Sequence, residues 1–209
     1  KPQTEPVLSK AVIKGQRSVK NEAGESVVIE IPLNTYTYTF STIPTNVEEL
    51  KQYNISGDDG RYKVLALYVM SLRTWKPENQ TDCEEMIGYL CNKQLSVYEK
   101  QRLAEQMKKS KQYLYLGNAF LNGATPANDY TPSQPYSITL TQDSVVDEDQ
   151  IYIPANPSIP SPDQYRAFIY CKASEWIDVY KSSKDGNWYM YKWMDLITSI
   201  KAPASSNPF

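Results

Sequence analysis

The chain has 209 residues, of which 41% are hydrophobic and 22% charged, and its net charge is −2 at pH 7. These proportions are typical of a globular protein with enough apolar residues to build a core, and they argue against a disordered chain. The slightly negative charge provides no basic field for a phosphate backbone, so we expect no nucleic-acid partner.

The sequence contains no histidine. Histidine exchanges protons near neutral pH and is the commonest metal ligand, so its absence excludes Ser-His-Asp triads, Cys-His dyads and HExxH zinc sites. Cys83, Cys91 and Cys171 form no C-x-x-C pair, and the glycines are too scattered for a phosphate-binding loop. We therefore expect buried free thiols and no cofactor, and the sequence favours a protein that is not an enzyme.

The longest apolar run, residues 64–70, is far shorter than the ~20 residues that a membrane-spanning helix needs, so the sequence predicts no such segment. The first residue is a lysine. A removed signal peptide and a chosen starting point both account for it, so a soluble protein in the cytoplasm and an exported one both stay open.

The first part of the chain predicts strands. Residues 1–26 are polar and of mixed charge, and we expect an arm with at most one hairpin strand. Residues 27–31 (VVIEI) predict a strand that Pro32 interrupts, because proline cannot donate to a sheet ladder, and a turn follows at 33–34. Residues 35–40 (TYTYTF) alternate without a fault and predict a second strand with its aromatic rings on one face.

The middle of the chain predicts four helices. Three of them start at reciprocal capping pairs, which are Asn46 and Glu49, Thr81 and Glu84, and Ser96 and Glu99. The other helix, at about 61–73, is apolar nearly all round and must therefore be buried.

The last part alternates with a period of two. The expected strands are 136–140, 151–153, 165–171, 175–181 and 187–193. Asp185 and Gly186 tolerate the positive φ of a two-residue hairpin turn, so the last two strands should pair antiparallel. Residues 195–200 add a helical turn.

The order of elements predicts an α+β fold with N-terminal strands, about four helices and an antiparallel sheet of about five strands packed on the helices. We expect an N-terminal arm (1–26), a single domain (27–200) and a frayed tail (201–209). Within the domain, a helical part (44–122) joins a sheet part (136–194).

The seam between these parts, residues 123–136 (GATPANDYTPSQPY), contains three prolines. Because proline restricts the unfolded chain, and because flexible linkers are rich in glycine and serine, we expect an ordered crossing rather than a tether. Tyr130 and Tyr136 are its expected anchors.

Four stretches carry a resemblance to a known family: TYTYTFSTIPTNVEELKQY, KVLALYVMSL, EEMIGYLCNKQLSVYEKQRLAEQM and GATPANDYTPSQPYSITL. Over about residues 30–200 the chain resembles an uncharacterised bacterial family, a domain of unknown function found in gut Firmicutes. The resemblance implies a shared fold and, because the family has no assigned activity, no catalytic residue.

Carboxylates offer two weaker sites. Asp147, Glu148 and Asp149 could bind calcium, but they lack the spacing of a calcium loop, so an acidic turn is the preferred interpretation. A carboxylate such as Asp178 or Asp195 could serve an enzyme or a small-molecule site in a pocket between sheet and helices.

The aromatic content, 17 Tyr, 4 Trp and 4 Phe, is the feature that most favours binding. Alternation places rings on both faces of the last hairpin, and only one face can pack on the helices, so rings are left for a partner or for a covering arm. The candidate binding residues are Tyr130, Tyr136, Trp176, Trp188, Tyr191 and Trp193. We expect a non-enzymatic binding or interaction domain with a protein or carbohydrate partner, and a structural segment of a longer envelope protein stays open.

Overall fold

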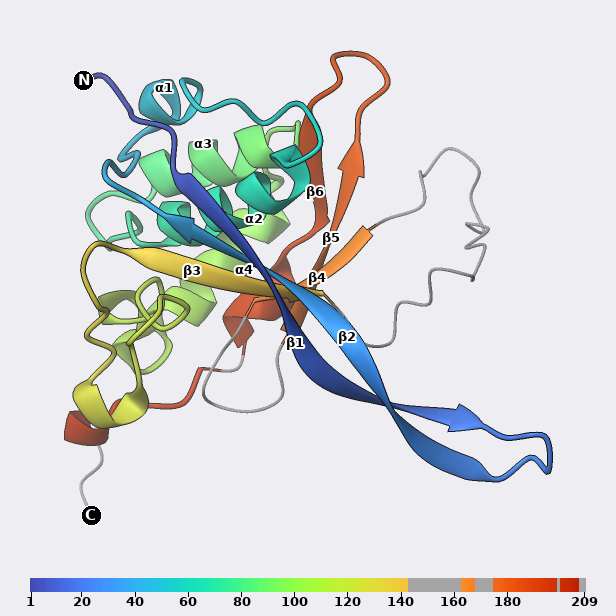
Figure 1. Ribbon diagram of the computed structural model, residues 1–209. Coiled ribbons are helices and arrows are strands. Elements are labelled where there is room, and N and C mark those ends of the chain that lie inside the picture. Colours follow the sequence, from blue (N-terminus) through green and yellow to red (C-terminus); the bar gives the residue numbers. More distant parts are fainter. Residues whose placement is uncertain (143–162, 168–174, 199, 207–209) are drawn as a thin grey trace.

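The computed structural model describes residues 1–142, 163–167, 175–198 and 200–206, with the backbone alone for 163–167, 175 and 176 (Figure 1). Its strands are β1 (Val7–Lys20), β2 (Ser26–Thr39), β3 (Ser137–Gln142), β4 (Asp163–Ala167), β5 (Glu175–Lys181) and β6 (Trp188–Lys192). Its α-helices are α1 (Val47–Leu50), α2 (Gly60–Leu72), α3 (Thr81–Leu90) and α4 (Val97–Lys108). Short 3₁₀ helices are η1 (Lys109–Leu114), η2 (Pro126–Asn128), η3 (Met194–Thr198) and η4 (Ala204–Ser206).

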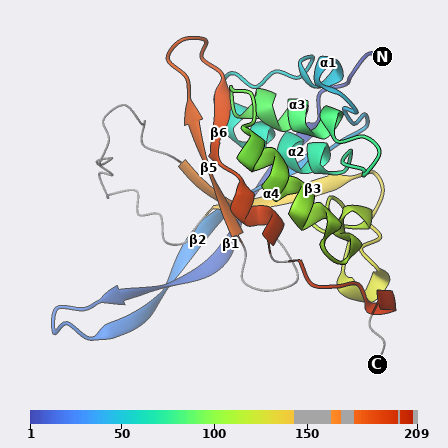
Figure 2. The same ribbon diagram turned by 180° about the vertical axis from the view of Figure 1, so that it is seen from behind.

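The expected α+β class, N-terminal strands and four helices are confirmed. All neighbouring strands pair antiparallel, in the order β1-β2-β3-β4-β5-β6. The expectation of about five strands packed on the helices is wrong. The three strands β1–β3 and the hairpin β5–β6 are joined by the five residues of β4 alone, and the helices gather on one side of them (Figure 2).

The N-terminal strands differ most from expectation. β1 pairs with β2 over its whole length, from Val7 opposite Thr39 to Lys20 opposite Ser26, and Pro32 lies inside β2 instead of ending it. β3 pairs with β2 only between residues 35 and 39. The missing amide of Pro32 therefore falls where β2 has a single neighbour, and proline is tolerated at such an edge.

Residues 12–34, the outer part of β1 and β2 with the turn between them, extend away from the helices; we call this segment the ribbon (Figure 1). β1 and β2 continue beyond the sheet because each has fourteen residues, whereas β3 beside them has six. Residues expected to form a polar arm thus build half of a protruding hairpin.

The core lies between α2 and the sheet. The expected burial of this helix is confirmed, since the successive residues Val64, Leu65 and Ala66, which point to different sides of α2, are all buried. Tyr36, Tyr38 and Phe40 are buried together, as their alternation predicts, and the hydroxyl of Tyr38 donates to the carbonyl oxygen of Asp59 at 3.0 Å.

One of the three expected reciprocal caps is complete and a second is present in part, because Glu49 accepts from the amide of Thr45 rather than from that of Asn46. Ser96 and Glu99 form the full reciprocal box, and the side chain of Asn46 accepts from the amide of Glu49. The prediction at Thr81 is wrong: Thr81 is already helical, and the preceding Gln80 makes no side-chain cap.

The seam is ordered and the tail is docked on it. Thr125 and Asn128 cap η2 reciprocally, and the left-handed residue Asp129 accepts from the amide of Ser205 at 2.9 Å. The frayed end that we expected for 201–209 is therefore wrong up to residue 206, because the seam offers its first residues hydrogen-bond partners.

The β5–β6 hairpin is antiparallel as predicted, but its two-residue turn is wrong. Ser182 and Asn187 close a longer loop, in which the carboxylate of Asp185 accepts from the amide of Asn187 and from the hydroxyl of Tyr189. A side chain that bonds its own backbone two residues on stabilises such a loop against the tight turn. The expected strand 151–153, the acidic residues 147–149 and Cys171 lie outside the described residues.

Within the stretches that the structure describes, none of the helices combines the length and the hydrophobicity needed to cross a bilayer.

Candidate functional site

The six aromatic residues proposed for binding do not share one surface. Tyr130 and Trp193 are buried, Tyr136 and Trp188 are half-buried, and Tyr191 is 51% exposed. Trp176 belongs to β5, and its side chain is outside the described part. For Trp188, Tyr191 and Trp193 the alternation failed to predict exposure because a register shift between Asp178 and Val179 interrupts the pairing of β5 with β6.

The two buried rings have structural contacts. The ring of Tyr130 stacks on Tyr115 with centroids 5.4 Å apart, and its hydroxyl donates to the carbonyl oxygen of Lys201 at 2.6 Å. Trp193 meets Tyr68 edge to face, and the hydroxyl of Tyr68 donates to the Trp193 carbonyl oxygen at 2.9 Å. These residues join the seam to the tail and the sheet to α2, so neither ring faces solvent.

Trp188 belongs to a cluster at the N-terminal end of α2. The guanidinium carbon of Arg61 lies 4.9 Å from the ring centre of Tyr62 and 5.5 Å from that of Trp188. Tyr62 stacks on Tyr36 with centroids 3.6 Å apart. Burial, together with a hydrogen bond to Tyr62, raises the pKa of Tyr36 above its usual value, so the Tyr36 phenol stays neutral and serves packing.

Tyr136 lies against Arg73, the C-cap residue that follows α2. The guanidinium carbon is 4.3 Å from the ring centre, and Nε donates to Oδ1 of Asn118 at 2.8 Å. Arg73 lines a hollow of about 450 Å³, and Tyr136 lines a neighbouring hollow of about 460 Å³. Arg61 and Arg73 were missed because no local pattern marks an arginine that a distant aromatic residue will meet.

The carboxylates of the alternative function lie apart. Asp178 is buried on β5, whereas Asp195 is exposed in η3 and pairs with Lys192 at 3.3 Å. Neither lines the two hollows beside Arg73 and Tyr136. Within the described part of the chain, no cluster of cysteine, aspartate and glutamate is placed to hold a metal ion.

Two of the three thiols are free and buried. Burial raises the pKa of the Cys91 thiol to about 12, and it raises that of Cys83 further. We expect iodoacetamide at pH 8 to leave both unmodified in the folded protein and to alkylate both in urea, as peptide mass spectrometry would measure. Alkylation of folded Cys83 at the rate of a free thiol would contradict this burial.

The ribbon is the surface feature that the sequence did not reveal. It carries five of the large hydrophobic side chains that are exposed among the described residues: Val12, Ile13, Val27, Val28 and Ile29. The signal was the aliphatic stretch 27–31 (VVIEI), which was interpreted as a strand that Pro32 interrupts. Exposed aliphatic residues at such a density are typical of surfaces that contact another protein or a membrane.

One protein family model matches residues 42–204, and its description is "Domain of unknown function (DUF6935)". No curated protein matches the chain, and no solved structure matches it. The match begins after β2, so it includes the whole lining of the hollow beside Arg73 and leaves the ribbon outside.

Proposed function

The chain belongs to this family of unknown function, and on that premise we propose that it is a non-enzymatic interaction module whose ribbon binds a second copy of the chain. The observation that carries the proposal is the exposed aliphatic face of the ribbon. Aliphatic side chains offer contact area without the flat rings that stack on sugars, so a protein fits this surface better than a carbohydrate.

The pairing register divides the ribbon into two faces. Ile13 lies opposite Leu33, Arg17 opposite Ile29, and Val19 opposite Val27. Because side chains alternate along a strand, these residues share one face with Ile31, and Arg17 is the only charged residue among them. The other face carries most of the charge, including Lys14 and Glu30, whose charged atoms are 3.6 Å apart.

The distribution of charge favours contact through the aliphatic face of the ribbon rather than through the edges of its strands. β1 contains four basic residues and no acidic one, namely Lys10, Lys14, Arg17 and Lys20. Two β1 edges that met would bring like charges together, and lysines on an edge strand oppose such pairing. Packing of two aliphatic faces avoids this repulsion and buries the apolar side chains.

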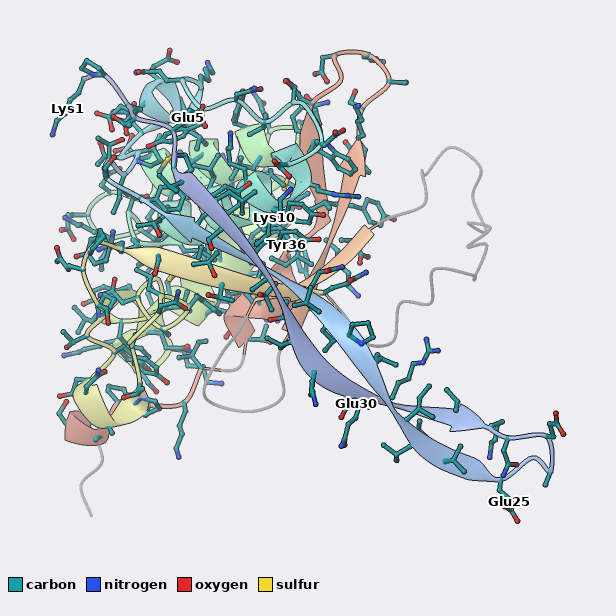
Figure 3. The ribbon with its side chains drawn as sticks, in the orientation of Figure 1. Lys1, Glu5, Lys10, Glu25, Glu30 and Tyr36 are labelled. Carbon is teal, nitrogen blue, oxygen red and sulfur yellow. The ribbon has the colours of Figure 1, made fainter. Side chains whose placement is uncertain are left out.

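The ends of the ribbon carry charge of both signs. Glu25 lies at the tip and Lys10 near the body of the protein (Figure 3), but Lys20 lies beside the tip, opposite Ser26, and Lys10 pairs with Asp59 at 2.9 Å. The charge at the two ends therefore does not select the orientation of the second copy.

Ile29→Lys tests the proposal, because it places a charge in the middle of the aliphatic face at a position that is 37% exposed. We expect the wild-type chain to sediment as a dimer at micromolar concentration and the variant to dissociate at least ~10-fold more readily. Analytical ultracentrifugation over a concentration series measures both.

Val28→Lys is the matched control, since Val28 is the adjacent residue, lies on the opposite face and is 67% exposed. It adds the same charge to the same strand and should leave dimerisation unchanged. A wild-type chain that stays monomeric over the whole series, or equal dissociation of both variants, would contradict the proposal.

Two finer expectations remain part of this proposal. A bacterial origin rests on the resemblance of the sequence, and genome sequences that encode relatives would check it. A contribution of Tyr191 to partner binding is favoured by its exposure on β6, and Tyr191→Ala in the same sedimentation experiment would measure it.

A further inference from the structure

We propose that the hollow beside Arg73 binds a small molecule through an oxyanion group, a carboxylate or a phosphate. This inference does not depend on the ribbon. The hollow has a volume of about 450 Å³, and its lining includes Arg73, Lys76 and Asn46, with Ile43 and Met70 as apolar walls. It therefore combines positive charge with an apolar surface for the body of a ligand.

Arg73 is held in place from three directions. Its Nε donates to Asn118 at 2.8 Å, and its guanidinium carbon lies 4.3 Å from the ring centre of Tyr136. Gly117 approaches so closely that a Cβ at that position would lie 2.5 Å from Cγ of Arg73 and 2.7 Å from its Cα. A side chain fixed in this way loses little conformational entropy when it binds a ligand.

The hydrogen bond and the ring contact leave the outer donors of Arg73 available. A guanidinium carries five N–H donors in one plane, and the hydrogen bond of Arg73 to Asn118 uses only Nε. Among the described residues, none accepts a hydrogen bond from the two terminal nitrogens of Arg73. Two parallel N–H donors fit the two oxygens of a carboxylate or a phosphate.

Two further donors line the same hollow. Lys76 is exposed, and no acceptor for its ammonium group is found within the described part of the chain. Asn46 uses Oδ1 to cap α1 and keeps Nδ2 as a donor. The carboxylate that lines the hollow, Asp82, accepts from Nδ2 of Asn79 at 2.7 Å. The lining thus carries two positive side chains, Arg73 and Lys76, against one negative side chain, Asp82, and this excess of positive charge favours an anion.

The probes are inorganic phosphate and acetate, each titrated separately into the full chain and followed by NMR of the backbone amide signals of the residues that line the hollow. We expect saturable binding of at least one anion with a dissociation constant of about 1 mM, and Arg73→Gln should raise it at least ~10-fold. The anion that binds more tightly shows whether the ligand binds through a phosphate or a carboxylate group.

Arg102→Gln is the matched control, because it removes the same charge from α4, where Arg102 pairs with Glu105 at 3.2 Å. It should change the constant less than ~2-fold. Lys76→Gln changes only an exposed side chain, so it tests the site without a risk to the fold and should also weaken binding. Absence of saturable binding by both anions, or equal weakening by Arg73→Gln and Arg102→Gln, would overturn the proposal, while the ultracentrifugation result would stay unaffected.

Discussion

Leu67→Ala is expected to lower the free energy of unfolding by about 2–5 kcal/mol, the range for truncation of a fully buried leucine. Leu67 lies in the middle of α2 and has no exposed surface. Because this helix is buried on nearly all sides, the surrounding residues have little freedom to close the cavity. Urea unfolding followed by circular dichroism would measure the loss.

Val97→Ala is the control for this change, since Val97 is also an aliphatic residue of a helix but is 72% exposed on α4. Its expected effect is within about 0.5 kcal/mol. If the two substitutions cost the same, α2 would not be the centre of the core.

Gly60→Ala is expected to destabilise the protein by about 1–3 kcal/mol, the usual cost of overpacking. Helix propensity alone would give the opposite result, a gain in stability, because alanine inside a helix is more favourable than glycine by about 1 kcal/mol. A Cβ at Gly60 would collide with the carbonyl oxygen of Ile55 and would lie 2.7 Å from Cδ1 of Trp188. The same carbonyl accepts from the amide of Trp188 at 2.8 Å, so the substitution would separate α2 from β6.

Gly24→Ala separates this collision from the general cost of losing a glycine. Gly24 has a φ of +77° in the ribbon turn, and nothing lies within 4 Å of the position that an added methyl group would take. We expect a loss of about 1 kcal/mol from backbone strain alone. Thermal unfolding of both variants makes the comparison, and a stabilised Gly60→Ala protein would show that the contact is absent in solution.

The two proposals concern different parts of the chain. The Arg73 hollow lies inside the stretch that the family model matches, whereas the ribbon precedes it. We therefore expect relatives to share the hollow more often than the ribbon.

Local patterns were sufficient where one segment sets its own conformation. Alternation placed Tyr36, Tyr38 and Phe40 on the buried side of a strand, and the apolar surface of 61–73 required a buried helix. Ser96 and Glu99 lie three residues apart and cap their helix with each other, so no distant residue decides the outcome.

Local patterns failed where a distant neighbour decides. Pro32 is harmless because β3 ends before reaching it. Rings that looked available for binding, such as Tyr130 and Trp193, are covered by the tail and by α2.

By itself, the sequence determined the α+β class, the buried helix and the exclusion of histidine chemistry, because composition and periodicity act within one segment. The tertiary structure alone decided which surfaces are exposed, since exposure depends on what packs against each face. That is why the aliphatic face of the ribbon and the donors of Arg73, rather than the tyrosines and tryptophans as a group, carry the proposed binding.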